Sequence, residues 1–216
     1  MKILLAGHEG SKCILKISSY LTNKYLSDFE VIYLNYGQAP DFLGTYVSLD
    51  NEQIGGVNSW SKYLVEYLET IKDKLVIFAL DDYLINSKVD KFLYNVLLNK
   101  VKGDVVCAKL CDNSHYTPHQ YTLEGLVFTL NPVEYTCTTQ YTIWNKDFLI
   151  EVLKQVNNPW EFELKGTEYI NKSGKKVIGS LKPVISYYTN SCLSSRWKGI
   201  DYTGINEKDL RVIKKL

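Results

Sequence analysis

A run of six apolar residues that ends in two adjacent acids constrains the fold of this chain more than any other feature. Residues 75–80 read Leu-Val-Ile-Phe-Ala-Leu, and Asp81 and Asp82 follow at once. A short, continuous apolar run of this kind predicts a strand buried on both faces of a sheet. Ligands of open α/β sheets bind beyond the carboxyl ends of the strands, so we expect the two acids at the ligand-binding edge.

Strands and helices alternate through the first half of the chain. Apolar spacing predicts strands at 3–6, 29–34, 46–49 and 75–80, and helices at 14–25, 60–71 and 89–100. The second half predicts strands at 105–110, 125–130, 134–138 and 177–186, a helix at 146–156 and a hairpin turn at 174–175. We therefore expect an α/β fold with a mostly parallel central sheet and a mixed or antiparallel C-terminal half.

Charge and composition narrow the function classes. The net charge is +1, so the chain offers no broad basic field for nonspecific binding of nucleic acid. No apolar stretch approaches the roughly 20 residues that a membrane span needs. The five cysteines are odd in number and lack metal-site spacing, which predicts free buried thiols in a reducing compartment. We expect a soluble cytoplasmic protein with neither a nucleic-acid partner nor a membrane span.

The acidic pair has two readings. Adjacent carboxylates repel each other unless a cation lies beside them. Mg²⁺ and Mn²⁺ favour such oxygen ligands and also bind diphosphate oxygens, so Asp81 and Asp82 are our candidate metal ligands. The alternative is that the two acids cap the helix that follows them. The sequence leaves both readings open.

A second group of candidates lies in the mixed half. Gln140, Trp144 and Trp160 offer an amide and aromatic rings, which suit sugar hydroxyls and sugar faces. We assign Gln140 and Trp144 to acceptor binding, although core packing is the favoured reading of the tryptophans. Glu161 and Glu163 stand among aromatic residues, where partial burial would raise a carboxyl pKa and suit a general base. Either glutamate fits, with a slight preference for Glu161 as the nearer to the expected helix start.

Together with Asp81, six further residues are candidates for contact with a bound nucleotide. Two lie in the first loop, two at the start of the second helix and two near the C-terminus: Gly7, His8, Asn58, Trp60, Arg196 and Lys198. Arg196 or Lys198 could clamp a diphosphate, and the alternative is that both are surface residues. The first loop lacks the glycine-rich phosphate-binding fingerprint, and its His8 also fits an ordinary loop residue.

Four segments together resemble a known family. Residues 60–64, 76–83, 140–144 and 159–163 occur in the order found in small GT-A-type glycosyltransferases from bacterial surface-polysaccharide loci and large DNA viruses, among them the capsid-glycosylating enzymes of chlorella viruses. The resemblance implies a GT-A fold, a nucleotide-diphosphate sugar donor, and Mn²⁺ or Mg²⁺ as cofactor. Asp81 and Asp82 match the family's metal-binding acids, although Asp-Asp-Tyr replaces a strict Asp-x-Asp. Glu161 or Glu163 falls where an inverting enzyme has its base.

The resemblance implies transfer of a sugar, a deoxyhexose such as rhamnose or else glucose, to a glycan or glycoprotein acceptor. One domain over 1–216 would divide into a nucleotide-sugar-binding half, 1–103, and an acceptor-side half, 104–216. A viral protein of this kind would act in the host cytoplasm. Two other functions remain open. A nucleotidyltransferase needs a basic, glycine-rich first loop, and here that loop has only Lys12. The other is a catalytically silent carbohydrate-binding domain.

Overall fold

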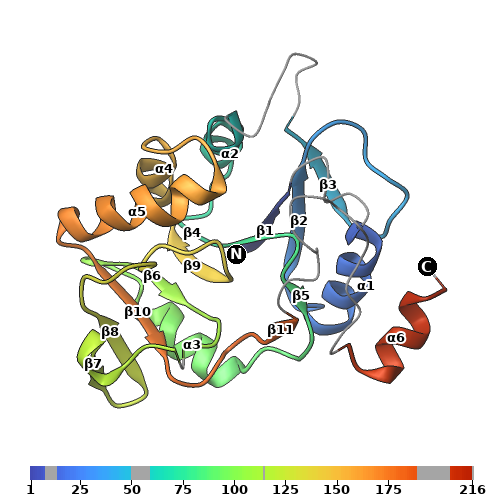
Figure 1. Cartoon of the computed structure of the whole chain (residues 1–216). Helices are drawn as coiled ribbons and strands as arrows, with labels where there is room; N and C mark the ends of the chain where they lie inside the picture. The colour runs from blue at the N-terminus through green and yellow to red at the C-terminus, as the bar shows by residue number, and fades with distance from the viewer. Residues whose placement is uncertain (8–13, 50–58, 114, 189–204, 216) are drawn as a thin grey trace.

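A computed structural model describes residues 1–7, 14–49, 59–113, 115–188 and 205–215 of the chain. In this part, nine strands form one sheet (Figure 1). Their order across the sheet is β3 (Thr45–Ser48), β2 (Glu30–Asn35), β1 (Lys2–Ala6), β4 (Leu75–Leu80), β9 (Thr142–Asn145), β6 (Val105–Lys109), β10 (Lys176–Ser180), β8 (Val127–Leu130) and β7 (Tyr121–Glu124). A second, two-stranded sheet pairs β5 (Leu84–Ile85) with β11 (Tyr187–Tyr188).

The direction of β9 positions the site. β3, β2, β1 and β4 are parallel, whereas β9 lies antiparallel between β4 and β6. Thr142, at the start of β9, pairs with Phe78 near the end of β4 and with Lys109 at the end of β6. The chain that enters β9 therefore reaches the same sheet edge as the acids after β4.

Helices cover both faces of the sheet (Figure 1). One face carries α2 (Trp60–Thr70), α4 (Lys146–Leu153) and α5 (Pro159–Ser173), and the other carries α1 (Leu15–Tyr25), α3 (Lys91–Lys100) and α6 (Glu207–Ile213). Side chains alternate along a strand, so Leu4 of β1 packs in the first core, and Ile3 and Leu5 pack in the second. This two-sided burial explains the uninterrupted apolar sequence of the central strands.

The expected fold class is confirmed, an α/β fold with a mostly parallel sheet and a mixed second half. Three local expectations are wrong. Residues 134–138 form no strand, the last expected strand ends at Ser180, and the turn at 174–175 is not a hairpin. Gly174 instead ends α5 in the left-handed conformation, with φ 67°, which glycine adopts without steric cost. The four-residue strand β9 is absent from the strands expected from the sequence.

The expectation of buried free thiols has a structural counterpart at three of the five cysteines. Cys107, Cys111 and Cys137 are buried free thiols, and burial raises the pKa of each thiol above its ordinary value. Cys13 and Cys192 lie outside the described residues.

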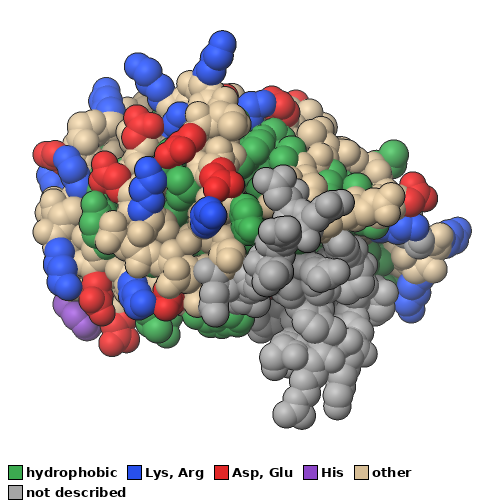
Figure 2. Space-filling view, turned by 90° about the horizontal axis from the view of Figure 1, so that it is seen from above, with side chains coloured by type: hydrophobic (Ala, Val, Ile, Leu, Met, Phe, Trp, Pro, Cys, Tyr) green, Lys and Arg blue, Asp and Glu red, His purple; other side chains and the backbone are tan. Residues whose placement is uncertain are grey.

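Within the described ranges, no helix has the length and apolar character to cross a membrane. On the face drawn in Figure 2, basic and acidic side chains are interspersed rather than gathered by sign.

Candidate functional site

Asp81 is held at the carboxyl end of β4 by the neighbouring strands. Its backbone N–H donates to Ala6 O, at the end of β1, at 3.0 Å. The residue is 3% exposed, and its Oδ2 accepts a hydrogen bond from Asn35 Nδ2 at 3.3 Å. Asn35 is the last residue of β2 and is absent from the sequence-based candidates, although a polar residue that ends an apolar strand is a usable signal. Asp81 is thus fixed in the interior beside three strand ends.

Gly7 makes room for this carboxylate. A Cβ atom at Gly7 would lie 2.0 Å from Asp81 Oδ2 and 2.6 Å from Asn35 Nδ2. Both distances are far below van der Waals contact, so the present arrangement requires a residue without a side chain. Sequence analysis assigns Gly7 to nucleotide binding. It lies at the expected edge of the sheet, and the contact that explains its identity is the one with Asp81.

Asp82, unlike Asp81, has a buried carboxylate oxygen for which the described residues supply no hydrogen bond. Its side chain is half-buried, and Oδ1 is a buried atom with no hydrogen-bond partner in the part of the chain that the structure describes. Burial raises the pKa of this carboxyl above its ordinary value, and the negative charge of Glu163 raises it further. A buried carboxylate oxygen without a donor is costly, and a bound cation would remove that cost.

The capping alternative for the acidic pair is wrong. The residues after Asp82 form a turn and the short strand β5, not a helix, and Leu84 N–H donates to the backbone oxygen of Asp82 at 3.1 Å. The next helix, α3, is capped by Asp90, whose Oδ1 accepts from Leu93 N–H at 3.0 Å. Neither acid therefore caps the helix that follows, α3.

Glu163 projects from α5 toward the same edge. Its Oε1 accepts two hydrogen bonds from Thr139, from the N–H at 3.0 Å and from Oγ1 at 2.8 Å. The Tyr83 hydroxyl lies 3.2 Å from Thr139 Oγ1. No donor among the described residues binds Glu163 Oε2. One carboxylate oxygen is thus anchored and the other is available. Neither Thr139 nor Tyr83 is among the sequence-based site residues, and no local pattern marks Thr139.

Glu161 points elsewhere. Its Oε2 accepts from the backbone N–H of Asn157 at 2.9 Å and from Asn157 Nδ2 at 3.1 Å, and its Oε1 accepts from Lys165 Nζ at 2.8 Å. The Lys165 hydrogen bond and the Asn157 N–H hold the pKa of Glu161 below its ordinary value. The expectation of a raised pKa is wrong for this residue, and of the two glutamates it is Glu163 that is bound at the sheet edge.

The two acceptor-side candidates, Gln140 and Trp144, differ in how deeply they are buried. Gln140 is half-buried at the sheet edge, because the preceding residue, Thr139, accepts a hydrogen bond from Leu80 N–H at 3.0 Å. Trp144 is 0% exposed on the central strand β9 and packs against Phe162, with ring centroids 5.8 Å apart. Its assignment to acceptor binding is wrong, because a sugar cannot reach the ring without opening the core.

Burial also excludes one of the candidates for nucleotide binding, Trp60. Trp60 is 2% exposed and packs against Phe78 and Phe162, with ring centroids 6.0 Å and 5.9 Å away. It belongs to the core under α2 and is not a ligand contact. The other four candidates lie outside the described residues: His8, Asn58, Arg196 and Lys198.

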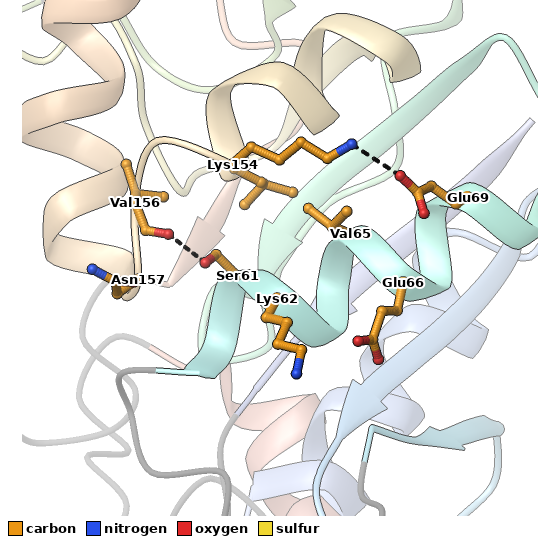
Figure 3. Close-up of a pocket in the computed structure, with 9 residues that line it drawn as sticks. Ser61, Lys62, Val65, Glu66, Glu69, Lys154, Val156 and Asn157 are labelled. Atoms are coloured by element: carbon orange, nitrogen blue, oxygen red, sulfur yellow. Dashed lines mark hydrogen bonds and ion pairs between the residues drawn. The ribbon is translucent and has the colours of Figure 1, made fainter.

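A hollow of about 470 Å³ lies apart from this edge, between α2 and α4 (Figure 3). Lys154 Nζ and Glu69 Oε1 form an ion pair of 3.0 Å across it, and Ser61 Oγ donates to Val156 O. Asn157, the partner of Glu161, also lines the hollow. None of the sequence-based site residues that the structure describes lines this hollow, so it is not our candidate site.

The donor set at the sheet edge suits a cation that is shared with a substrate. Among the described residues, no three His, Cys, Asp or Glu side chains form a metal cage. Mg²⁺ in phosphate-transfer sites is commonly bound by one or two carboxylates, with substrate phosphates and water completing the shell. The open Oδ1 of Asp82 fits that mode, whereas Asp81 Oδ2 already accepts from Asn35.

Comparison with known proteins identifies the fold. No protein-family model and no curated protein matches the sequence. The fold is similar to a cytidylyltransferase from Leptospira borgpetersenii, with 13% identity, TM-score 0.53, and 99% of this chain covering 93% of that one. It is also similar to the galactosyltransferase LgtC, solved with donor and acceptor sugar analogues. The identity is 12% and the TM-score 0.52, and the match covers 100% of this chain and 96% of that one. A third similar structure is S. aureus TarS 1–349 in complex with UDP. The identity is 14% and the TM-score 0.52, and the match covers 86% of this chain and 60% of that one.

These similarities establish a fold that glycosyltransferases and nucleotidyltransferases share. All three identities are too low to carry an activity across. The broader resemblance to GT-A proteins is supported by the fold, and the more specific one to chlorella-virus enzymes receives no support from these comparisons.

Proposed function

We propose that this chain is a glycosyltransferase that moves a sugar from a nucleotide-diphosphate donor to a hydroxyl of a carbohydrate acceptor, with a divalent cation and inversion at the anomeric carbon. The observation that carries the proposal is the pairing of two carboxylates with different environments. Asp82 has a buried oxygen without a partner, and Glu163, near enough to raise its pKa, has one anchored and one available oxygen. Such a difference in environment separates a cation ligand from a proton acceptor.

In this proposal each carboxylate has its own task. Asp82 would hold the cation, and Asp81, tied to Asn35, keeps the end of β4 in place. Mn²⁺ or Mg²⁺, when bound, neutralises the charge that develops on the departing nucleoside diphosphate. Glu163 accepts the proton of the acceptor hydroxyl through Oε2 as that oxygen attacks the anomeric carbon. Thr139 keeps Glu163 oriented for this step.

The halves of the chain divide the work accordingly. β1 to β4 present Gly7 and the two acids from residues 1–103, and the donor binds there. The segment before β9 and the start of α5 present Gln140 and Glu163 from residues 104–216, and the acceptor binds there. The solved neighbours support a nucleotide-sugar substrate, since one holds donor and acceptor sugar analogues and another holds UDP.

Nucleotidyl transfer is the second candidate, because a cytidylyltransferase is as similar in fold as the glycosyltransferases are. The two reactions release different products. A nucleotidyltransferase transfers the nucleoside monophosphate of a nucleoside triphosphate to a sugar or phosphosugar and releases pyrophosphate. A glycosyltransferase releases a nucleoside diphosphate from a nucleotide sugar. The sequence 7–13 contains one basic residue, Lys12, which fits a diphosphate donor better than a triphosphate.

The test is a thermal-shift screen of nucleotide sugars and nucleoside triphosphates, each with Mn²⁺ and with a chelator. We expect a nucleotide sugar to raise the melting temperature more with Mn²⁺ than with chelator, and Asp82→Asn to abolish the difference. Asp104→Asn is the matched control, since Asp104 is 73% exposed and lies beside the start of β6, at the opposite edge. Stabilisation by a triphosphate alone, with pyrophosphate release, would favour the second candidate. Equal stabilisation in chelator would refute the role of the cation.

A further inference from the structure

Trp160 is an exposed indole beside a catalytic candidate. It is 68% exposed, whereas Trp144 and Trp60 are 0% and 2% exposed. A large aromatic side chain normally contributes to the core, and an exposed one close to a candidate catalytic residue is placed to contact a ligand bound there. Leu164, one helical turn further along α5, is 57% exposed and extends the apolar surface.

The helix holds Trp160 on a rigid turn. Asn158 caps α5, and its Oδ1 accepts from Glu161 N–H at 2.9 Å. Pro159 is the first helical residue, where its fixed φ favours helix. The backbone of Trp160 lies between these two constraints. The indole is therefore presented by an ordered first turn, which lowers the entropic cost of binding a ligand against it.

Helical spacing places the indole on the side of α5 that carries the proposed base. Trp160, Glu163, Leu164 and Thr167 stand at i, i+3, i+4 and i+7, so they form one stripe. Two members of the stripe contact the segment that enters β9. Glu163 accepts from Thr139, and Thr167 Oγ1 accepts from Cys137 N–H at 3.0 Å. Trp160 continues this stripe by one turn.

The direction of α5 shows which end of the stripe reaches the site. Its last residue, Ser173, precedes β10, which begins at Lys176 at the edge opposite the acids (Figure 1). Glu163 lies at the edge where Thr139 is bonded to Leu80. The helix therefore runs away from the functional edge, and Trp160 lies on the outer side of Glu163.

From this arrangement we propose that Trp160, extended by Leu164, is the platform on which the apolar face of an acceptor pyranose ring stacks. The subsite rests on the proposed function and names the acceptor class, a pyranoside whose attacking hydroxyl reaches Glu163 Oε2. The C–H bonds on one face of a pyranose are weakly positive, and the face of an indole is negative, so the two attract. Donor binding is assigned to Asp82, which follows β4, whereas Trp160 lies on α5, so the platform serves the acceptor.

The experiment compares Trp160→Ala, Trp160→Phe and Phe92→Ala. Phe92 is the matched control, because it is 66% exposed on α3, which covers the other face of the sheet. The acceptors are methyl α-rhamnoside, β-glucoside, β-galactoside and β-xyloside, since an aryl group would itself stack on Trp160. Consumption of the nucleotide sugar is measured against acceptor concentration, and donor hydrolysis without acceptor is measured separately. Melting temperature and oligomeric state are recorded for each variant.

We expect Trp160→Ala to raise the acceptor KM by about tenfold, the size of a lost stacking contact. Donor KM, donor hydrolysis and melting temperature should stay near those of the wild type. Trp160→Phe should restore most of the acceptor affinity, and Phe92→Ala should change nothing. An unchanged acceptor KM in Trp160→Ala, with or without a change in oligomeric state, would overturn the subsite and leave the proposed function standing. A wild-type protein that consumes no nucleotide sugar would overturn both.

Discussion

Thr139 donates both its backbone N–H and its hydroxyl to the same carboxylate oxygen of Glu163, at 3.0 Å and 2.8 Å. This double anchor fixes the carboxylate and leaves the second oxygen open. Because Thr139 also accepts from Leu80 N–H, the anchor ties α5 to the end of β4, where the acidic pair begins. The relationship connects the two halves of the proposed site, and several measurements can test it.

Replacing the proposed base should abolish most turnover. Glu163→Gln keeps size and most hydrogen bonding but removes the proton-accepting carboxylate, so turnover should fall ~10²-fold or more with donor affinity nearly unchanged. Glu161→Gln is the matched control two residues away, and it should keep near-normal turnover because Glu161 is engaged by Asn157 and Lys165. Steady-state kinetics with melting curves decide the matter. Normal turnover in both variants would place the base elsewhere.

The hydroxyl of Thr139 should matter more than its shape. Thr139→Val keeps the volume and the N–H bond to Glu163 but removes the hydroxyl donor, so we expect turnover to fall by about tenfold. Thr139→Ser retains the hydroxyl and should restore most of the rate. The comparison is made on kcat, with donor KM as the internal control. Equal rates for the valine and serine variants would contradict an orienting role.

Asp82 should be unfavourable for stability when no cation is present. Burial and the charge of Glu163 raise its pKa, so the folded state retains protons that the unfolded state releases. For a raised carboxyl pKa, stability is lost as pH rises from the ordinary value, 3.8, through the folded-state pKa. Asp82→Asn should therefore raise the melting temperature at pH 7 in chelator and abolish stabilisation by Mn²⁺ with donor. A variant that melts below the wild type in chelator would contradict this view of the oxygen.

Gly7 should not tolerate even a methyl group. A Cβ there would lie 2.0 Å from Asp81 Oδ2, so Gly7→Ala must displace a buried, hydrogen-bonded carboxylate. We expect destabilisation of about 1–3 kcal/mol, the usual cost of overpacking, together with weakened donor binding. Urea unfolding and the thermal-shift screen measure the two effects. Unchanged stability would mean that Asp81 relocates without cost.

A buried carboxylate far from the site should govern the docking of α6. Asp209 is 0% exposed and accepts hydrogen bonds from Tyr20, Lys24, Tyr25 and Asn206. Burial alone would raise its pKa, but the hydrogen bonds from Lys24, Asn206 and the tyrosines outweigh it and lower the pKa. For a lowered pKa, the stabilisation is present above the ordinary value, 3.8, and is lost as pH falls through the folded-state pKa.

We therefore expect Asp209→Asn to lower the stability at pH 7 by about 2 kcal/mol, since a partner of Lys24 is removed. The difference from the wild type should shrink as pH falls below 3.8, because the unfolded wild-type chain takes up a proton at Asp209 before the folded protein does. Melting curves from pH 3 to pH 7 test this. Glu207→Gln, at an 88% exposed position of the same helix, is the control and should change little. A difference that is independent of pH would rule out the charge as the cause.

The parallel half of the fold could be predicted from local patterns. Residues 3–6 and 75–80 are apolar throughout because both faces of these strands are covered, and that burial is written into consecutive residues. The position of Asp81 and Asp82 at the functional edge follows from the end of such a strand. Sequence alone therefore determined the fold class and the place of the acidic pair.

The division of labour among similar residues required the tertiary structure. Trp144 and Trp160 are sixteen residues apart and both stand among aromatic neighbours, yet one is fully buried and the other is 68% exposed. Glu161 and Glu163 differ because successive residues of a helix point in different directions, and only Glu163 faces Thr139. These choices depend on which elements pack together. The insertion of β9 between β4 and β6 is a contact between distant segments, which no local pattern encodes.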